Sequence, residues 1–320
     1  MLIAQERVAV GAQESEEEQG TPRSTDAHLQ QIRKMLPELI KVDVARSAFK
    51  VTVYLGLFVS MVALIVSSES VLVTVLAQMV LGLLWAHGLE LQHECLHQAL
   101  FPSRTANRLL GFLFGAPMLV SYSHYHYQHL HHHKHVGTSE DAEIFNYERS
   151  SLNNPLAFVI RAWNLNRVPA FLTTLLGFLQ GSYPAVFSAP HKRREVLVEY
   201  LALALLLGGG LYAILSGAAP ILVKVWLIPW LAFGEFFHFM IELPEHLGCD
   251  KSKKDIFINT RSYKTNPLVA YIANGNNYHV EHHLFPRVAI HKLAAVHELI
   301  KPRIQNQAKS YLEAVRQVLS

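Results

Sequence analysis

The stretch His124-Tyr-His-Tyr-Gln-His-Leu-His-His-His-Lys-His135 places seven histidines within twelve residues. A neutral imidazole nitrogen is a common metal ligand, and histidines three or four residues apart on one face of a helix can bind the same ion. His129, His132 and His133 have this spacing. A histidine-rich loop can also collect metal ions without using them. A functional site therefore requires matching ligands elsewhere in the chain.

The composition of the 320-residue chain indicates a membrane enzyme with an aqueous part. The chain is 51% hydrophobic and has a positive mean hydropathy, yet it contains long polar stretches. Its net charge of +3 is spread without basic runs interleaved with aromatic residues, so we expect no nucleic-acid partner. The two cysteines, Cys95 and Cys249, are too few for a disulfide framework, an iron–sulfur cluster or a cysteine-rich zinc site. Electrons for a redox reaction would have to come from another protein.

Four apolar segments are long enough to cross a bilayer as helices, which predicts an all-α integral membrane protein. They lie at about residues 47–67, 71–91, 196–215 and 221–241. Lys50 is close enough to a helix end for its ammonium group to reach the interface. The glycines Gly208–Gly210 allow either a close helix approach or a bend.

Two other apolar regions are not expected to cross the membrane. Leu109–Val120 is too short and is predicted to be buried or re-entrant. Leu152–Phe187 mixes apolar residues with arginine and asparagine, which favours helices that lie at the interface.

The remaining chain divides into three parts. Residues 1–23 are expected to form a disordered acidic tail without the pattern of a signal peptide. Residues 24–46 form an amphipathic segment on the membrane surface or on the protein's own core, and residues 47–320 form the membrane domain. The links Ser67–Ser70 and Ser216–Pro220 contain no Lys or Arg, so the basic remainder is assigned to the cytosol. We therefore expect the N-terminal, central and C-terminal regions, and with them both termini, on the cytosolic side.

Further histidines supply the matching ligands. His93 and His97 are one helical turn apart, and the spacing of the central stretch recurs in His279-Val-Glu-His282-His283. Glu235, His238, Glu242 and His246 lie three or four residues apart at the end of the fourth span, where Pro244 can distort the last turn. The best combination gives nine candidate ligands: His93, His97, His129, His132, His133, His246, His279, His282 and His283. Nine neutral ligands suit two ions that each keep an open position, and nitrogen ligands are compatible with iron, zinc or copper.

These motifs resemble the three histidine boxes of the membrane fatty acid desaturase family, including the Leu-Phe-Pro that follows the last box at Leu284–Pro286. The resemblance implies two non-haem irons that activate O2 and remove two hydrogens from a fatty acyl chain, carried by a lipid or a thioester. It also implies four transmembrane helices with a cytosolic helical cap that holds the histidine-rich dimetal site. A lipid bilayer and an external electron donor, ferredoxin-like or cytochrome b5-like, are implied as well. The nine histidines match the family's ligand positions, with His246 aligned only through its place after the fourth span.

Three other polar residues are predicted to lie close to the metal ligands. Glu242 stands where relatives can have a polar group near the metals. Asp141 is followed by Ala142, where the family usually has an Asp-Pro pair, and it is a candidate partner of a ligand histidine. Asn277, just before the third box, is another candidate.

Other functions remain open from the sequence. A hydroxylase or ketolase that acts on a carotenoid or alkyl substrate would use the same site but transfer oxygen. A metal transporter, a histidine-rich storage protein and a structural zinc site are further alternatives. Transporters usually place ionisable ligands near the bilayer midplane, whereas these histidines lie at helix ends.

Overall fold

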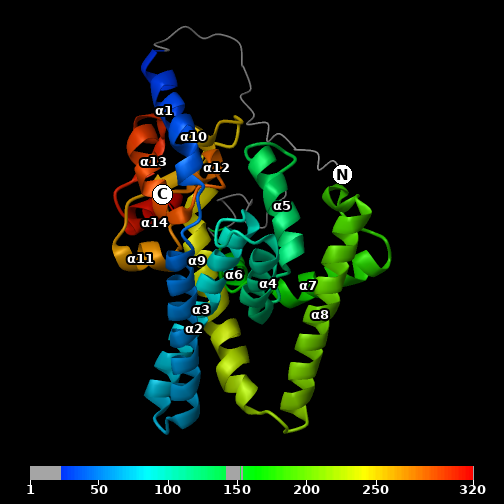
Figure 1. Cartoon of the computed structure of the whole chain (residues 1–320). Coiled ribbons are helices and arrows are strands. Elements are labelled where there is room, and N and C mark those ends of the chain that lie inside the picture. The colour runs from blue at the N-terminus through cyan, green and yellow to red at the C-terminus, as the bar shows by residue number, and fades with distance from the viewer. Residues whose placement is uncertain (1–22, 142–151, 153, 320) are drawn as a thin grey trace.

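The computed structural model describes residues 23–141, 152 and 154–319. Long helices extend to one side of a cap that contains α1 and α10–α14 (Figure 1). The tail predicted over residues 1–23 lies, apart from Arg23, outside the described residues. The longer helices are α1 (Arg23–Leu39), α2 (Val44–Ser67), α3 (Val71–Leu96), α4 (Arg104–Gly115), α5 (Tyr122–His135), α6 (Pro155–Ala162), α7 (Arg167–Leu179), α8 (Pro190–Leu215), α9 (Glu235–His246), α13 (Leu293–Ile300) and α14 (Tyr311–Leu319). The shorter elements are η1 (Ala116–Met118), η3 (Ala185–Phe187), η4 (Val223–Leu227), η5 (Pro229–Gly234), α10 (Ile256–Asn259), β1 (Arg261–Tyr263), α11 (Pro267–Ile272), α12 (His279–Leu284), η6 (Ile290–Lys292), η7 (Lys301–Arg303) and β2 (Asn306–Ala308).

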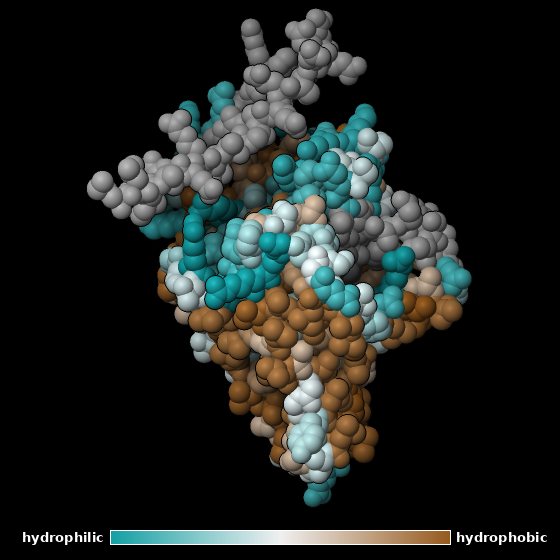
Figure 2. Space-filling model, turned by 90° about the vertical axis from the view of Figure 1, so that its right-hand side faces the viewer, coloured by the Kyte–Doolittle hydropathy of each residue, from teal (hydrophilic) through white to brown (hydrophobic). Residues whose placement is uncertain are grey.

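Four helical segments among the described residues are long and apolar enough to cross a membrane: Val44–Ser67, Val71–Leu96, Pro190–Leu215 and Val223–His246. This confirms the predicted all-α architecture with four spans. Apolar side chains cover the lower part of the molecule, and polar residues cover the cap (Figure 2). The second and fourth spans continue beyond their predicted ends to Leu96 and His246. The polar ends of these two helices therefore remain helical and carry histidines into the cap.

The shorter apolar segments lie beside the spans. Helix α4 has an exposed outer face, on which Leu109 and Leu113 are 60% and 61% exposed, whereas Phe114 is buried. The segment predicted to be buried or re-entrant is therefore an amphipathic helix. Helices α6 and α7 occupy the region predicted to contain interfacial helices.

Glycine allows a close approach at a position that the sequence did not indicate. A β-carbon on Gly82 of α3 would lie 2.5 Å from Phe233 Cβ and 2.6 Å from the Pro229 carbonyl oxygen. The second and fourth spans therefore touch through their backbones. Of the three glycines that the sequence did indicate, Gly210 makes a close approach, because a β-carbon there would lie 2.5 Å from Cζ3 of Trp226 in the fourth span. Gly208 and Gly209 have nothing within 4 Å of such an atom.

The N-terminal segment packs on the protein's own core. Ile32 and Leu39 of α1 are buried in a cluster with Leu293 and Val296 of α13, which agrees with one of the two placements that the sequence left open. Lys50 also differs from expectation. Its ammonium group donates to the Glu94 carboxylate at 2.8 Å and to Asn274 Oδ1 at 2.7 Å, so it joins α2 to α3 instead of reaching the interface.

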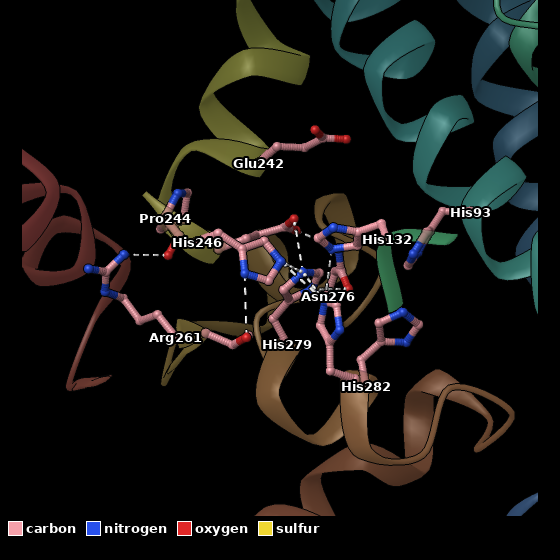
Figure 3. A network of polar contacts seen from close by, with 12 residues as sticks. His93, His132, Glu242, Pro244, His246, Arg261, Asn276, His279 and His282 are labelled. Carbon is pink, nitrogen blue, oxygen red and sulfur yellow. Dashed lines mark hydrogen bonds and ion pairs between the residues drawn. The ribbon is translucent and has the colours of Figure 1, made fainter. Parts of the chain in front are cut away.

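A small parallel sheet anchors the end of the fourth span. Strand β1 pairs with β2, and Arg261 on β1 is almost completely buried. Its guanidinium group donates to the backbone carbonyls of Pro244 at 2.5 Å and Leu247 at 3.0 Å (Figure 3). These bonds satisfy carbonyls at the helix end, where Pro244 interrupts the regular pattern. Because His246 lies between Pro244 and Leu247 in the sequence, these bonds also fix the position of its backbone.

Candidate metal centre

The first two candidate ligands stand at the end of α3. His93 lies on the last turn and His97 follows as the C-terminal cap, and both side chains are buried. Their ring centroids are 5.2 Å apart. A helical spacing of four residues thus directs both imidazoles into the same region.

Helix α5 resolves the reading frame of the histidine-rich stretch. Ser121 caps the helix by accepting a hydrogen bond from the His124 amide. His129 and His132 are buried, and His133 is half-buried beside them. His131 instead stacks on His135 at 4.2 Å on another face. The side chains of His129, His132 and His133 therefore face the interior.

The third box lies on the short helix α12. Gly275 precedes the helix with a φ of +77°, and a β-carbon there would collide with Ile290, so this turn needs glycine. His279, His282 and His283 are all buried.

The nine histidines form two adjoining groups, in which side chains from α3, α5, α9 and α12 converge (Figure 3). The first histidine group contains His93, His97, His129, His133 and His282, and the second contains His132, His246, His279 and His283. His133 joins the groups, because its ring centroid is 4.3 Å from that of His283.

The separations between ring nitrogens fit bound cations. In the first group His129 Nε2 lies 2.8 Å from His93 Nε2, 3.0 Å from His97 Nε2 and 3.0 Å from His133 Nε2. One nitrogen with at most one proton cannot form three such hydrogen bonds, whereas ligands around one ion converge in this way. With a metal–nitrogen bond of about 2.1 Å, neighbouring nitrogens lie about 3.0 Å apart at right angles and about 3.4 Å apart in a tetrahedron.

The second group has similar spacing. His246 Nε2 lies 2.9 Å from His279 Nε2 and 3.1 Å from His283 Nε2, and His132 Nε2 lies 3.3 Å from His283 Nε2. The first two distances lie nearer to the value for right-angled coordination, and the third lies nearer to the tetrahedral value. Both groups could therefore hold a metal ion.

The surroundings keep the imidazoles neutral. Burial lowers the pKa of His97, His129 and His282 well below the ordinary value, and neighbouring histidines lower it further. The same two causes lower the pKa of His279 and His283. Neutral rings keep a lone pair for a metal ion at neutral pH.

Hydrogen bonds to Nδ1 orient several of these rings. The Asp141 carboxylate accepts from His132 Nδ1 at 2.9 Å, Asn276 Oδ1 accepts from His279 Nδ1 at 2.9 Å, and the Asn259 carbonyl accepts from His246 Nδ1 at 3.1 Å. Each bond leaves Nε2 free to face the site. The structure places Asn276, not Asn277, beside a histidine. The Asn277 amide donates to the Tyr263 carbonyl because the adjacent residue of this turn points the other way.

Glu242 lies on α9 one turn before His246, and its carboxylate is 2.9 Å from His238 Nε2. It lines a small space of about 20 Å³ together with His93, His129, His246 and His279, which is room for about one water molecule. Tyr125 lines the same space, and nothing in the sequence indicated this.

A larger cavity of about 580 Å³ adjoins this space, and Tyr125 and Glu242 line both. Its volume lies within the range of about 300–1,000 Å³ that is usual for ligand pockets. Apolar walls come from Leu89, Phe171 and Phe239. Most of the other lining residues carry polar side chains. The cavity thus lies among the helices of the membrane domain, beside the small space that four of the candidate ligands line.

Arg167 and Glu235 form a buried pair in the wall of this cavity. Arg167 donates through Nε and Nη2 to the two carboxylate oxygens of Glu235, each at 2.9 Å. Trp230 donates to the same carboxylate at 2.7 Å. The Glu235 charge is therefore balanced and does not face the metal centre.

Comparison with known proteins agrees with this site. The model of the fatty acid desaturase family matches residues 69–314, and the chain belongs to this family, which confirms the resemblance inferred from the histidine boxes. The chain is also similar to the dihydrorhizobitoxine desaturase of Bradyrhizobium elkanii, with 26% identity over 227 residues. That alignment covers 67% of this chain and 63% of the relative, so the chain spans less than two thirds of the relative's length. The family and the site support a metal-dependent oxidoreductase of the desaturase type.

Proposed function

We propose that the protein is a membrane-bound non-haem di-iron enzyme that uses O2 to remove two hydrogens from a fatty acyl chain, carried by a lipid or a thioester. The observation that carries the proposal is the convergence of nine histidine nitrogens in two adjoining groups. Two iron ions held there would activate O2, the oxidant, for reaction with an unactivated C–H bond, which side-chain acids and bases cannot attack.

Iron is favoured over zinc by the chemistry of the reaction. Zinc has no redox chemistry in proteins, whereas removing hydrogen from an unactivated C–H bond needs a metal that supports oxidation. The first histidine group would hold one ion and the second group the other.

The chain's own residues orient the ligands and receive the substrate. Asp141 and Asn276 fix the rings of His132 and His279 through Nδ1. The apolar part of the large cavity would bind the acyl chain and exclude water from it. The small space lined by Tyr125 would admit O2 next to the histidines.

A second substrate class is favoured by the polar part of the cavity wall. Arg161, Asn164 and Gln128 line the cavity together with the apolar residues, so part of the wall is polar and would suit a substrate that carries a polar group. The relative from Bradyrhizobium elkanii is named for dihydrorhizobitoxine. We therefore include acyl substrates with a polar group near the reacting carbons, and a polar compound such as dihydrorhizobitoxine.

The proposed topology places both termini, the cap and the histidines in the cytosol, because the basic residues concentrate on that side. An external donor, ferredoxin-like or cytochrome b5-like, would dock on the cap and supply two electrons. Residues 24–46 would act as a segment of the cap and residues 47–320 as the desaturase domain.

The test is mass spectrometry of lipids and polar metabolites from cells that express the intact chain, the His132→Ala variant or the His131→Ala variant. His131 is the matched control, because it lies on the same helix but faces away from both histidine groups. We expect a product lighter by two hydrogens with the intact chain and with His131→Ala, and none with His132→Ala. Product from His132→Ala would refute the proposal, and a product that gains oxygen would favour a hydroxylase or ketolase.

A further inference from the structure

A carboxyl group without a partner lies inside the membrane domain. Glu90 on α3 is only 2% exposed, and its Oε2 atom has no hydrogen-bond partner among the residues that the structure describes. A buried polar group of this kind is costly unless something satisfies it. Ionisable side chains within membrane spans usually serve a function.

Two side chains of α9 face this group. His238 and Glu242 are one helical turn apart, both are buried, and His238 Nε2 lies 2.9 Å from Glu242 Oε1. One potential ligand atom from each of Glu90, His238 and Glu242 lies within 4.8 Å of the others. Glu242 extends from the turn of α9 that precedes His246 (Figure 3). We refer to Glu90, His238 and Glu242 as the glutamate–histidine cluster.

A cation would balance this cluster when both of its carboxylates are ionised. Two ionised carboxylates next to a neutral imidazole would carry two negative charges in a buried place. Arg167, the arginine near Glu242, is already bonded to Glu235 through two nitrogens. Leaving such charges uncompensated is strongly unfavourable. One divalent ion would balance both carboxylates and would also give Glu90 Oε2 a partner.

We propose that the glutamate–histidine cluster binds a third metal ion, separate from the ions of the two histidine groups. Two carboxylate oxygens and one imidazole nitrogen suit a divalent transition ion such as Mn²⁺, Fe²⁺ or Zn²⁺. His238 and Glu242 line the large cavity, and Glu242 also lines the small space beside the histidines. The cluster therefore adjoins both the proposed substrate cavity and the small space beside the histidines. This site rests on the geometry of the cluster and not on the reaction proposed above.

The test counts metal ions. Purified full-length protein is saturated with Fe²⁺ under argon, freed of unbound metal by gel filtration and measured by elemental mass spectrometry. The intact chain should bind three ions and the Glu90→Gln variant two. Glu195→Gln is the matched control, since Glu195 is a membrane-domain glutamate on α8 that pairs with Arg108 outside the cluster, and it should bind three.

A Glu90→Gln variant that binds as many ions as the intact chain would overturn the proposal, whatever the number held by the histidine groups. If Glu90→Gln does not elute as a folded protein, His238→Gln takes its place with the same expectation. A His132→Ala variant should lose iron from the second histidine group and keep the ion of the cluster. Failure of the di-iron proposal would therefore appear in the histidine variant, and failure of the third site in the Glu90 variant.

Discussion

Replacing Asp141 tests whether contacts behind the ligands hold the metal centre in shape. The Asp141 carboxylate and His132 Nδ1 are 2.9 Å apart, and their side chains are only 5% and 3% exposed. A hydrogen bond to a charged group contributes about 1.5–3 kcal/mol, and a neutral one about 0.5–1.5 kcal/mol. Asparagine keeps an acceptor but loses the charge, so Asp141→Asn should weaken metal binding by about 1.4 kcal/mol, or about tenfold. Asp141→Ala removes the acceptor and should weaken it by up to about 100-fold.

The assay is loss of iron to a chelator, followed over time in the purified protein. Because Asp141 supports His132, the ion of the second histidine group should leave first, while the first group keeps its ion. Glu140→Gln is the control, since this neighbouring carboxylate is 69% exposed and contacts His135 instead. Equal release from Asp141→Ala, Glu140→Gln and the parent would refute the reasoning, as would simultaneous loss of both ions.

Three further predictions concern the fold around the site. Gly82→Ala should lower the thermal unfolding temperature, because a β-carbon there would lie 2.5 Å from a side chain of the fourth span. Gly208→Ala is the control: it places its β-carbon in open space and should leave the unfolding temperature unchanged. Equal effects of the two substitutions would contradict this prediction. Arg167→Met should destabilise the protein by about 3–5 kcal/mol, because it leaves buried Glu235 unpaired. The double variant with Glu235→Gln should recover part of the lost free energy of unfolding, measured by denaturant unfolding. No recovery would count against a coupled pair. Burial lowers the pKa of His124 to about 4, whereas the pKa of histidine in the unfolded chain is about 6.5. The folded protein therefore has its full stability above pH 6.5 and loses stability as pH falls toward 4, because the unfolded chain binds the proton first. At pH 5 this loss is about 2 kcal/mol, and His124→Gln should show a smaller fall in unfolding temperature between pH 7.5 and pH 5 than the parent; an equal fall would exclude His124 as the cause.

Much of the fold could be predicted because length and hydropathy alone decide which helices can cross a membrane. The histidine boxes were also readable, since spacings of three and four residues put ligands on one helical face. The frame within residues 124–135 was ambiguous, because His131 and His135 share those spacings. Only packing against α3 and α12 distinguishes the inward face.

Long-range pairing could not be predicted. Lys50 pairs with Glu94, 44 residues away, and no local pattern links the two. Asn276 and Asn277 are adjacent and chemically identical, so only the turn at Gly275 determines which one faces His279. Glu90 lies one turn before His93 on the same helix, but its position opposite His238 and Glu242 depends on the close approach of the second and fourth spans.

Labelling with 18O2 tests the central claim most directly. Cells, or purified protein with an electron donor and candidate substrates, are incubated under 18O2. The masses of the products are then measured by mass spectrometry. The proposed desaturation predicts a product lighter by two hydrogens that contains no 18O, because the oxygen leaves as water. A product that carries 18O, or one that forms equally in the His132→Ala variant, would contradict desaturation by the histidine-bound metals.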